Sequence, residues 1–390
     1  MAEKIGIVSV AQTRYEASKP HLSNGELVFE VVEKVLLETG LKYEDQVGED
    51  KRPCIDKIIS CSEDYWQGRT ISDMLLHLEM GGFSMDAPKV AADGCQAVYH
   101  GVIDILSGKH DVVLVVAHRK ESETDGSIIE NAGLDPIYLR PLGLDFLSAA
   151  ALQARRYMHK YGLKPEQIAG VVVKNLKNAR DNPLAMRAMD VSIGDVLASK
   201  VLSDPIRELD ARPRADGACA LILAKESYAR TLTDRPVWII GIGNCYDAHY
   251  LGDRDLADSA ALSLAAKRAY GMAGITNPRT EISLAEISEE WSYQELLWAE
   301  ELGLCERGKA AEMLDSGITQ IRGSLPINAS GGLLSGVPSG VAGISRVAEA
   351  FLQLQDKAGG RQVADARTAV IQGAAGACGQ SQCVLVLDNR

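Results

Sequence analysis

The stretch NASGGLLSGVPSG, residues 328–340, decides the fold, because this glycine-rich loop runs directly into an apolar helical pattern over residues 341–354. Glycine allows a backbone to approach a ligand closely. A helix N-terminus behind such a loop offers unpaired N–H groups and a positive dipole end to an oxyanion. A tight turn between ordinary elements has the same composition. Features elsewhere in the sequence must therefore decide whether this segment binds a ligand or is an ordinary turn.

Length, composition and charge exclude several classes of protein. The 390 residues are 46% hydrophobic and 24% charged, which predicts a globular chain with room for two cores of ordinary size. The longest apolar runs, such as residues 112–117, have strand length, and residues 1–7 carry no signal-peptide core. We therefore expect a cytoplasmic protein without a membrane partner. The net charge of −12 argues against nucleic acid as a partner.

One segment departs from this acidic balance. Residues 151–215 hold twelve Lys or Arg against seven Asp or Glu, a local charge of +5. Such a segment could receive a phosphorylated ligand. Solvated faces of helices and loops would have the same composition.

The eight cysteines form no C-x-x-C pair and lie mostly in apolar segments. This arrangement argues against a disulfide framework and against a zinc site, so we expect no metal. Each cysteine is expected as a reduced thiol that either fills the core or acts as a nucleophile.

Strand and helix patterns alternate along the chain and divide it into two similar halves. In each half a glycine-containing turn opens a helix that leads to an apolar strand. We expect an α/β architecture with largely parallel pairing. The expected division is an N-terminal half (residues 1–118 and 216–235), an inserted loop domain (119–215) and a C-terminal half (236–390).

Several sequence blocks agree in order and spacing with one known family. They are VAADGCQA (90–97), ILSGKHDVVL (105–114), NPLA (182–185), DGACA (216–220), EISEEW (286–291), ELGLC (301–305) and the opening loop. Over nearly the whole chain the sequence resembles the thiolase superfamily, and within it the sterol-carrier-protein type. The resemblance implies duplicated halves in a five-layered α-β-α-β-α arrangement with an inserted loop domain. It also implies an active site where two helix N-termini meet, an acyl-CoA ligand along the loop domain, and a homodimer.

The chemistry of the family implies a cysteine thiolate that takes an acyl group from a 3-oxoacyl-CoA and passes it to CoA. Coenzyme A would then be a co-substrate, with no covalently bound cofactor. A helix N-terminus lowers a thiol's pKa, and backbone N–H groups of the glycine loops hold the thioester oxyanion.

This chain departs from the family pattern where the chemistry takes place. Aligned on Gly94, the usual nucleophile position falls at Ala91, and the histidine of the family's G-H-P element is replaced by Val337. Ser288 stands where relatives carry histidine or asparagine. No histidine follows His249. The usual imidazole base is therefore missing from the C-terminal half.

Three residues are candidates for the missing catalytic groups. Cys95, at an expected helix start, is the candidate nucleophile, although a lone helical cysteine is ordinarily a small hydrophobe. Cys378 lies in what resembles the C-terminal glycine loop, where many thiolases keep an acid/base cysteine. Glu290 is an unusual carboxylate that could act as a base if it is buried, whereas its neighbour Glu289 matches a structural acidic position of the family.

Weaker candidates complete the expected site. Tyr293 and His100 are alternative proton carriers, with a packed aromatic ring and an exposed helical histidine as the plain interpretations. We expect contacts to the thioester or to CoA from the polar and glycine residues Asn328, Ser330, Gly331, Gly332, Ser288 and Gly379. For Asn328 and Ser330 the alternative is hydrogen bonding within the turn.

The sequence leaves three functions open. The first is thiolysis of a 3-oxoacyl-CoA through a cysteine acyl-enzyme, with a bulky or aromatic acyl group that suits Val337 and Ser288. The turn at residues 93–95 resembles a branch that works beside a small zinc-ribbon/OB-fold partner. This branch includes retro-aldolases and thiolases of aromatic breakdown, such as the enzyme that splits benzoylsuccinyl-CoA into benzoyl-CoA and succinyl-CoA. The second function is therefore retro-aldol cleavage of a 3-hydroxyacyl-CoA, and the third is a catalytically silent subunit that binds acyl-CoA.

Overall fold

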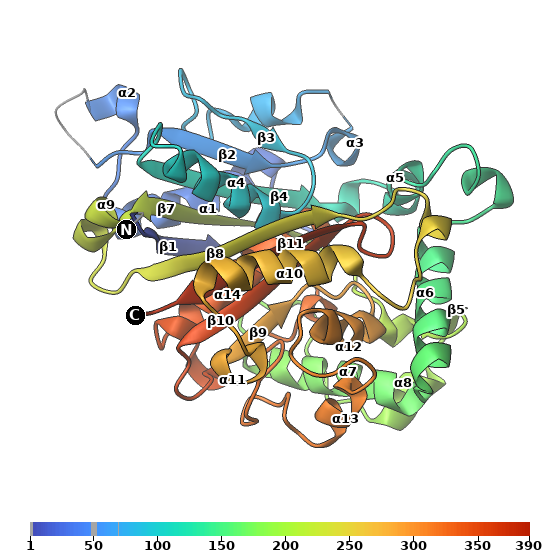
Figure 1. Cartoon of the computed structure of the whole chain (residues 1–390). Coiled ribbons are helices and arrows are strands. Elements are labelled where there is room, and N and C mark those ends of the chain that lie inside the picture. Colours follow the sequence, from blue (N-terminus) through green and yellow to red (C-terminus); the bar gives the residue numbers. More distant parts are fainter. Residues whose placement is uncertain (1–2, 48–52, 69) are drawn as a thin grey trace.

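The computed structural model describes residues 3–47, 53–68 and 70–390, and its core is one nine-stranded sheet (Figure 1). The strand order is β3-β2-β4-β7-β1-β8-β11-β10-β9. The strands are β1 (Ile5–Gln12), β2 (Lys57–Cys61), β3 (Lys89–Val90), β4 (Val112–Lys120), β7 (Asp216–Lys225), β8 (Val237–Tyr246), β9 (Leu284–Ile287), β10 (Thr368–Ala375) and β11 (Ser381–Asp388).

Most neighbouring strands are antiparallel, so the expectation of largely parallel pairing is wrong. Only β2 with β3, β2 with β4, and β9 with β10 run parallel among the described residues. The reason lies in the connections. The short loop 376–380 joins β10 to β11 as a hairpin, and β7 returns from the long insert to pair antiparallel with both β4 and β1. Hairpin returns of this kind cannot produce parallel neighbours.

Helices cover both outer faces and fill the middle, as the expected five layers require. The central helices α4 (Gly94–Leu106) and α14 (Ala342–Leu354) pack against each other, and each contacts strands of both halves. Helix α1 (Asn24–Thr39) covers β1, β4 and β7, whereas α10 (Ala260–Ala273) covers β8 and β11. Pairs between residues 5–7 of β1 and 237–239 of β8 join the two halves into one sheet.

Local signals explain where the helices begin. Ser23 is the N-cap of α1 and forms a capping box with Glu26, and Asn24 is the first helical residue. An apolar segment between β2 and β3 forms a 3₁₀ helix at Ser72–Leu76 rather than a regular α-helix. Ile71 has φ 54°, a left-handed conformation from which a regular helix cannot start.

The insert between β4 and β7 shares its core with the C-terminal half. It carries α5 (Gly126–Ala132), α6 (Phe146–Tyr161), α7 (Pro165–Asn178), α8 (Ile193–Ala198), β5 (Val201–Ser203) and β6 (Ile206–Arg207). One hydrophobic cluster joins residues of α6 and α7 to α10 and to α12 (Ser292–Glu301). The domain bounds given above remain predictions. The remaining helices are α2 (Glu44–Val47), α3 (Asp64–Gln67), α9 (Glu226–Leu232), α11 (Pro278–Glu281) and α13 (Ala310–Asp315).

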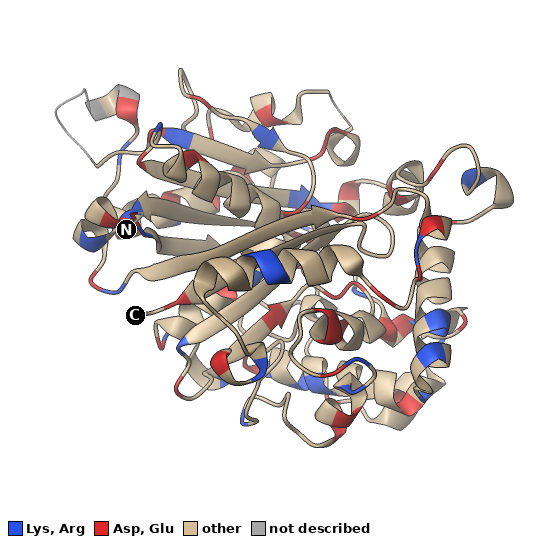
Figure 2. Cartoon of the chain, in the orientation of Figure 1, with Lys and Arg blue, Asp and Glu red and all other residues tan. Residues whose placement is uncertain are grey.

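Part of the excess positive charge of the insert is neutralised by ion pairs with other parts of the chain. Figure 2 shows Lys and Arg along α6. Arg156 forms two bonds of 2.8 Å to Asp255, and Lys160 lies 2.7 Å from Asp258. These cations of α6 are therefore paired with acidic residues of the C-terminal half. Within the described ranges, no helix combines the length and the apolar character needed to cross a membrane.

Candidate active site

A cavity of about 440 Å³ opens where the turn after β3, the segment after β9 and the loop between β10 and β11 meet. Two of the predicted catalytic or binding positions on the β9 segment, Ser288 and Glu290, line it, as does Gly379. Further wall residues come from the segments after β2 and β3, the insert, the end of β8 and the segment after it, α12 and the opening loop. They include Glu63, Trp66, Ala91, Ala92, Arg119, Glu130, Phe146, Tyr246, Asp247, His249, Trp298 and Ser339.

The turn that leads into α4 presents Ala91 to this cavity and buries Asp93 behind it. Asp93 is the N-cap of α4, and its Oδ1 accepts the backbone N–H of Cys95 at 2.9 Å. Its Oδ2 accepts the N–H of Gly343, the second residue of α14, at 2.8 Å. Burial raises the pKa of Asp93 to about 7. One carboxyl group thus ties together the starts of the two central helices.

The structure does not bring the Cys95 thiol to the cavity. Cys95 is fully buried, in a core cluster that includes Ile344 and Cys383. Burial raises the pKa of this thiol well above its ordinary value, with Cys383 as a further cause. The α4 start lies so close to α14 that an added Cβ at Gly343 would overlap Asp93 and Cys95. The plain interpretation, a small hydrophobe, fits this environment better than the predicted nucleophile.

Cys378 lies behind the cavity wall rather than on it. Its neighbours Ala377 and Gly379 line the cavity, whereas the Cys378 side chain is 3% exposed and packs with an apolar cluster that includes Leu139. The residue has φ 55°, and its carbonyl oxygen accepts a bond of 2.9 Å from Arg254. Burial raises the pKa of the thiol to about 12. A predicted acid/base role would need the loop to turn this thiol toward the cavity.

Glu290 and Ser288 do face the cavity. Burial raises the pKa of Glu290, and Arg212 opposes the shift from 3.8 Å, beyond hydrogen-bond distance. The Ser288 backbone N–H donates to Gln372 at 2.8 Å, while its Oγ is buried with no hydrogen-bond partner among the described residues. The indole N–H of Trp298 is equally unpartnered within that part of the chain. Ser288 and Trp298 thus belong to the wall that carries Glu290, with their two unpartnered polar atoms buried just behind it.

The opening loop contributes little to the cavity, contrary to its predicted ligand contacts. Asn328, at φ 54°, donates to Glu289 at 2.9 Å and to Glu295 at 2.8 Å, and accepts from the Ile287 N–H at 2.7 Å. All of these groups are buried. Glu289 itself has a pKa raised to about 8 by burial and by Glu295, and it lies outside the cavity. The Asn328 side chain is therefore occupied by residues 33–41 positions away in the sequence, which is neither a ligand contact nor the expected bonding within the turn.

The next residues of the loop are similarly occupied. Ser330 Oγ donates to Glu286 at 2.6 Å and accepts from Arg346 at 2.5 Å. Gly331 and Gly332 have φ 97° and 62°, and a side chain at Gly332 would overlap the Glu289 carboxylate. Of this loop, the structure places Ser339 on the cavity wall. The loop mainly supports the residues that follow β9.

We expect Asn328→Ala to lower stability rather than ligand affinity. Loss of the side chain leaves the Ile287 N–H and two carboxylates with fewer partners in a buried site, which costs about 3 kcal/mol at about 1–3 kcal/mol per group. Urea unfolding measures the loss, and KM for an acyl-CoA measures binding. A tenfold rise in KM without a loss of stability would show that Asn328 contacts the ligand, as the sequence predicted.

The remaining weak candidates are explained by packing. Tyr293 is buried and donates to Gln153 at 2.8 Å, and His100 is exposed on α4 beside Tyr99. Neither lines the cavity.

Sequence reasoning missed several wall residues. Arg119, at the end of β4, donates to Glu63 at 2.9 Å and also to Ser339, and its guanidinium lies 4.7 Å from the Trp66 ring. Glu130 reaches the cavity from α5. The one available signal was the charged run 118–123, which overlaps the last three residues of the fully buried strand β4.

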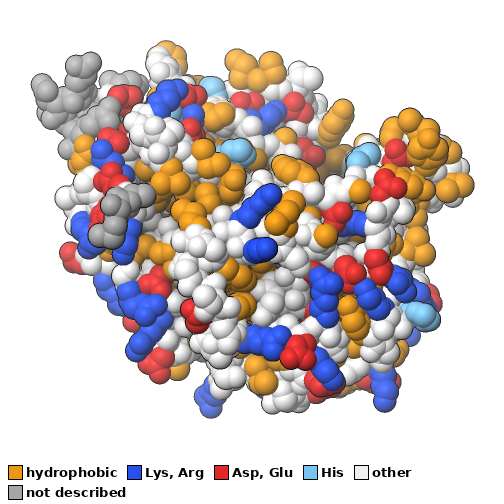
Figure 3. Space-filling view, viewed as in Figure 1, with side chains coloured by type: hydrophobic (Ala, Val, Ile, Leu, Met, Phe, Trp, Pro, Cys, Tyr) orange, Lys and Arg blue, Asp and Glu red, His pale blue; other side chains and the backbone are white. Residues whose placement is uncertain are grey.

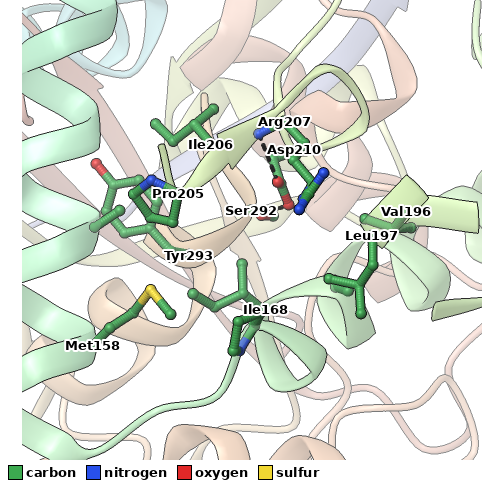
Figure 4. Close-up of a pocket in the computed structure, with 13 residues that line it drawn as sticks. Met158, Ile168, Val196, Leu197, Pro205, Ile206, Arg207, Asp210, Ser292 and Tyr293 are labelled. Carbon is green, nitrogen blue, oxygen red and sulfur yellow. Dashed lines mark hydrogen bonds between the residues drawn. The ribbon is translucent and has the colours of Figure 1, made fainter. Parts of the chain in front are cut away.

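A second, much smaller cavity lies between α6, α7, α8 and α12 (Figure 4). It holds about 20 Å³, room for a single water molecule, and its walls are mainly apolar, with Met158, Ile168 and Val196. Asp210 on its edge accepts bonds from Ser292 and from the Arg207 N–H. This space is too small for a substrate. Among the described residues, no group of His, Cys, Asp or Glu could hold a metal ion.

The chain is similar to proteins of one family across its length. Residues 243–389 match the family model "Thiolase C-terminal domain-like". An acetyl-CoA acetyltransferase of Methanothermobacter thermautotrophicus is 36% identical over 275 residues, 70% of this chain and 71% of that protein.

Two other relatives are named for different activities. The 17-hydroxy-3-oxo-4-pregnene-20-carboxyl-CoA lyase of Mycobacterium tuberculosis is 30% identical, covering 67% of this chain and 71% of its own. The benzoylsuccinyl-CoA thiolase subunit BbsB of Thauera aromatica is 27% identical, covering 69% and 70%. Among solved structures, the "Ltp2-ChsH2(DUF35) aldolase" superposes with a TM-score of 0.84 at 23% identity, over 99% of this chain and 98% of that one.

Proposed function

Because this chain belongs to the thiolase superfamily of acyltransferases, in its sterol-carrier-protein-type branch, we propose that it makes or breaks a carbon–carbon bond of an acyl-CoA in the cavity beside Ala91. The chain is a thiolase-type enzyme of acyl-CoA chemistry. The geometry best supports retro-aldol cleavage of a 3-hydroxyacyl-CoA with Glu290 as the base. The observation that carries this proposal is the cavity wall itself. It presents Glu290 and Ser288, and no cysteine among the described residues.

Retro-aldol cleavage needs a base for the 3-hydroxyl proton and a pocket that stabilises the enolate. Glu290 takes the hydroxyl proton as the Cα–Cβ bond breaks, and the electron pair of that bond passes into the thioester enolate. The Ser288 hydroxyl and the Trp298 indole N–H have no partner among the described residues, and both would have to turn toward the cavity to donate to the enolate oxygen. The products are a shorter acyl-CoA and an aldehyde or ketone. No acyl-enzyme forms, which is consistent with alanine at the usual nucleophile position.

The second candidate is thiolysis of a 3-oxoacyl-CoA through a cysteine acyl-enzyme, with coenzyme A as co-substrate. Cys378 favours it, since this residue lies between two wall residues, Ala377 and Gly379, in a strained left-handed conformation. The similarity to an acetyl-CoA acetyltransferase and to BbsB supports the same reaction. Cys95 would serve only after separation of α4 from α14.

Intact-mass spectrometry distinguishes the two reactions. The protein is incubated with 3-hydroxyacyl-CoA and 3-oxoacyl-CoA thioesters of the same acyl group, and so are Cys95→Ala and Cys378→Ala. We expect no covalent adduct, and cleavage rates within about threefold of wild type in both variants, because both thiols are buried outside the cavity. A stoichiometric acyl adduct that disappears in Cys378→Ala would establish thiolysis. An adduct that disappears in Cys95→Ala would restore the predicted nucleophile.

A bulky or aromatic acyl group suits the cavity. Trp66, Phe146 and Tyr246 supply aromatic walls, and the volume of about 440 Å³ exceeds what an acetyl group needs. A benzoylsuccinyl or steroid side-chain thioester, the kinds named for two relatives, is the substrate class we propose to test.

Exposed apolar surfaces support two protein partners. Tyr65, Met74, Leu78 and Phe83 are 63–76% exposed near the edge strand β3, where a second copy of the chain would form a homodimer. Figure 3 shows hydrophobic side chains on the projection at the upper right, which Figure 1 identifies as α5 and the segment after it. This projection exposes apolar residues of the insert, including Ile128.

We propose a small zinc-ribbon/OB-fold subunit as the partner of this projection. The superposed aldolase is named as a pair, Ltp2 with ChsH2(DUF35), which supports a two-component assembly for this chain as well. Ile137 and Leu142, which follow α5, are 69% and 82% exposed and would be covered by such a subunit.

A catalytically silent subunit remains the third function. It predicts acyl-CoA binding without turnover, even with the small subunit present, so the same substrates test it.

A further inference from the structure

Among the described residues, Glu130 is one of four carboxyl groups on the wall of the cavity, with Glu63, Asp247 and Glu290. It belongs to α5 of the insert, whereas Glu290 follows β9 of the C-terminal half. The side chains are 21% and 28% exposed, so both are partly open toward the cavity. The insert, which also contributes Phe146 to the wall, therefore adds an ionisable group to the site.

Neither carboxyl group has a strong ion-pair partner. The Arg214 guanidinium lies 3.6 Å from Glu130 Oε2, and that of Arg212 lies 3.8 Å from Glu290 Oε1. Arg212 is instead bonded to both oxygens of Glu121, at 2.8 and 3.2 Å. Its positive charge is largely compensated there. Arg214 and Arg212 thus lie beyond hydrogen-bond distance of Glu130 and Glu290 and only partly offset their negative charge.

All charged groups that face Glu130 come from other elements, since α5 carries no second charged residue. Asp64 of α3 is paired with Lys89, and Asp145 caps the start of α6. Arg119 and Asp247 on the cavity wall are paired with Glu63 and Arg254, respectively. The groups that remain near Glu130 are Arg212, Arg214, Glu121, Glu290 and the wall residue His249.

Glu130 and Glu290 line the same cavity, and the pKa of each carboxyl group is raised. Burial is the main reason that the pKa of Glu130 rises to about 7, and the charge of Glu290 is the next. Burial also raises the pKa of Glu290. A negative charge on Glu290 disfavours ionisation of Glu130 in a partly desolvated site, so the protonated form of Glu130 is favoured while Glu290 is a carboxylate. Such a pair supplies an acid and a base at the same pH.

We propose that Glu130 is the general acid of the reaction and protonates Cα of the enolate, while Glu290 is the base for the 3-hydroxyl group. This assignment rests on the proposed function. Glu290 takes the hydroxyl proton, the Cα–Cβ electron pair becomes the enolate, and the proton of Glu130 forms the new Cα–H bond. Transfer of a proton from Glu290 to Glu130 then restores both groups. The cycle needs no oxidant, reductant or further reactant.

Hydrogen exchange at Cα of a product-like thioester tests Glu130 apart from cleavage. Acetyl-CoA and propionyl-CoA are incubated in D₂O with the full chain, and deuterium at Cα is measured by mass spectrometry. We expect exchange in wild type and a loss of at least about 100-fold in Glu130→Gln, the usual contribution of a positioned acid or base. Glu290→Gln should keep exchange, and Glu123→Gln is the control, an exposed carboxylate ahead of α5.

The pH dependence provides a second readout that does not rely on a variant. Protonation of the enolate requires the acid form of Glu130, so kcat for cleavage should fall as the pH rises through about 7. Three results would overturn the assignment. The first is hydrogen exchange at the wild-type rate in the Glu130→Gln variant, and the second is a wild-type protein that exchanges hydrogen with neither thioester. The third result is a kcat that does not change between pH 5 and 9. If exchange depends on Glu130 but no 3-hydroxyacyl-CoA is cleaved, the proposed function fails and the role of Glu130 stands.

Discussion

Glu290→Gln is expected to lower kcat/KM for carbon–carbon bond cleavage by about 100- to 10,000-fold, the usual contribution of a general base. The amide cannot accept the 3-hydroxyl proton, yet it fills the same space. The fold should tolerate it, because the carboxylate lies 3.8 Å from Arg212 and is 28% exposed. Steady-state cleavage assays give the rate, and thermal unfolding confirms that the variant is folded.

Its neighbour Glu289 provides the matched comparison. The two glutamates are adjacent, but Glu289 is fully buried and bonded to Asn175 and Asn328, away from the cavity. Glu289→Gln should lower stability and leave kcat/KM of the folded protein within about threefold of wild type. A Glu290→Gln variant with the kcat/KM of wild type would show that Glu290 is not the general base.

Asp93→Ala is expected to produce the largest loss of stability, about 3–5 kcal/mol. The substitution leaves the N–H groups of Cys95 and Gly343 without an acceptor in a buried site, at about 1–3 kcal/mol each, and removes the N-cap of α4. Because Asp93 joins the two central helices, activity should fall with stability. Urea unfolding monitored by circular dichroism measures the loss.

Asp125→Ala is the control, because Asp125 is a helix N-cap that does not join two buried helices. Asp125 caps α5 by accepting the Ser127 N–H at 3.0 Å at an exposed position. It should cost about 1 kcal/mol or less, the ordinary value for an N-cap. Equal losses in the two variants would mean that the bond to Gly343 contributes nothing.

The sequence predicted the parts of the molecule that depend on local patterns. The opening loop and the turn at 90–97 led to the thiolase fold, which the similarity to known proteins confirms. Glu290 and Ser288 were also predicted for the site, and the structure places both on the cavity wall, because they follow a strand end. Their catalytic roles remain proposals.

The rest depended on contacts between distant segments. Helical periodicity does not reveal that the first turn of α4 faces α14, which buries Cys95. Likewise, the buried partners of Asn328 come from α12 and from the β9 segment, so its polar side chain resembled a ligand contact. Glu130 reaches the cavity only because the insert folds over it, and nothing in residues 126–132 indicates that placement.

The coenzyme A dependence of cleavage tests the central claim most directly. A 3-hydroxyacyl-CoA with a bulky 3-substituent is supplied without free CoA, and the products are identified by mass spectrometry. We predict one shorter acyl-CoA and one aldehyde or ketone in equal amounts, with no requirement for CoA. Cleavage of the 3-oxoacyl-CoA alone, dependent on added CoA and yielding two CoA thioesters, would contradict this account.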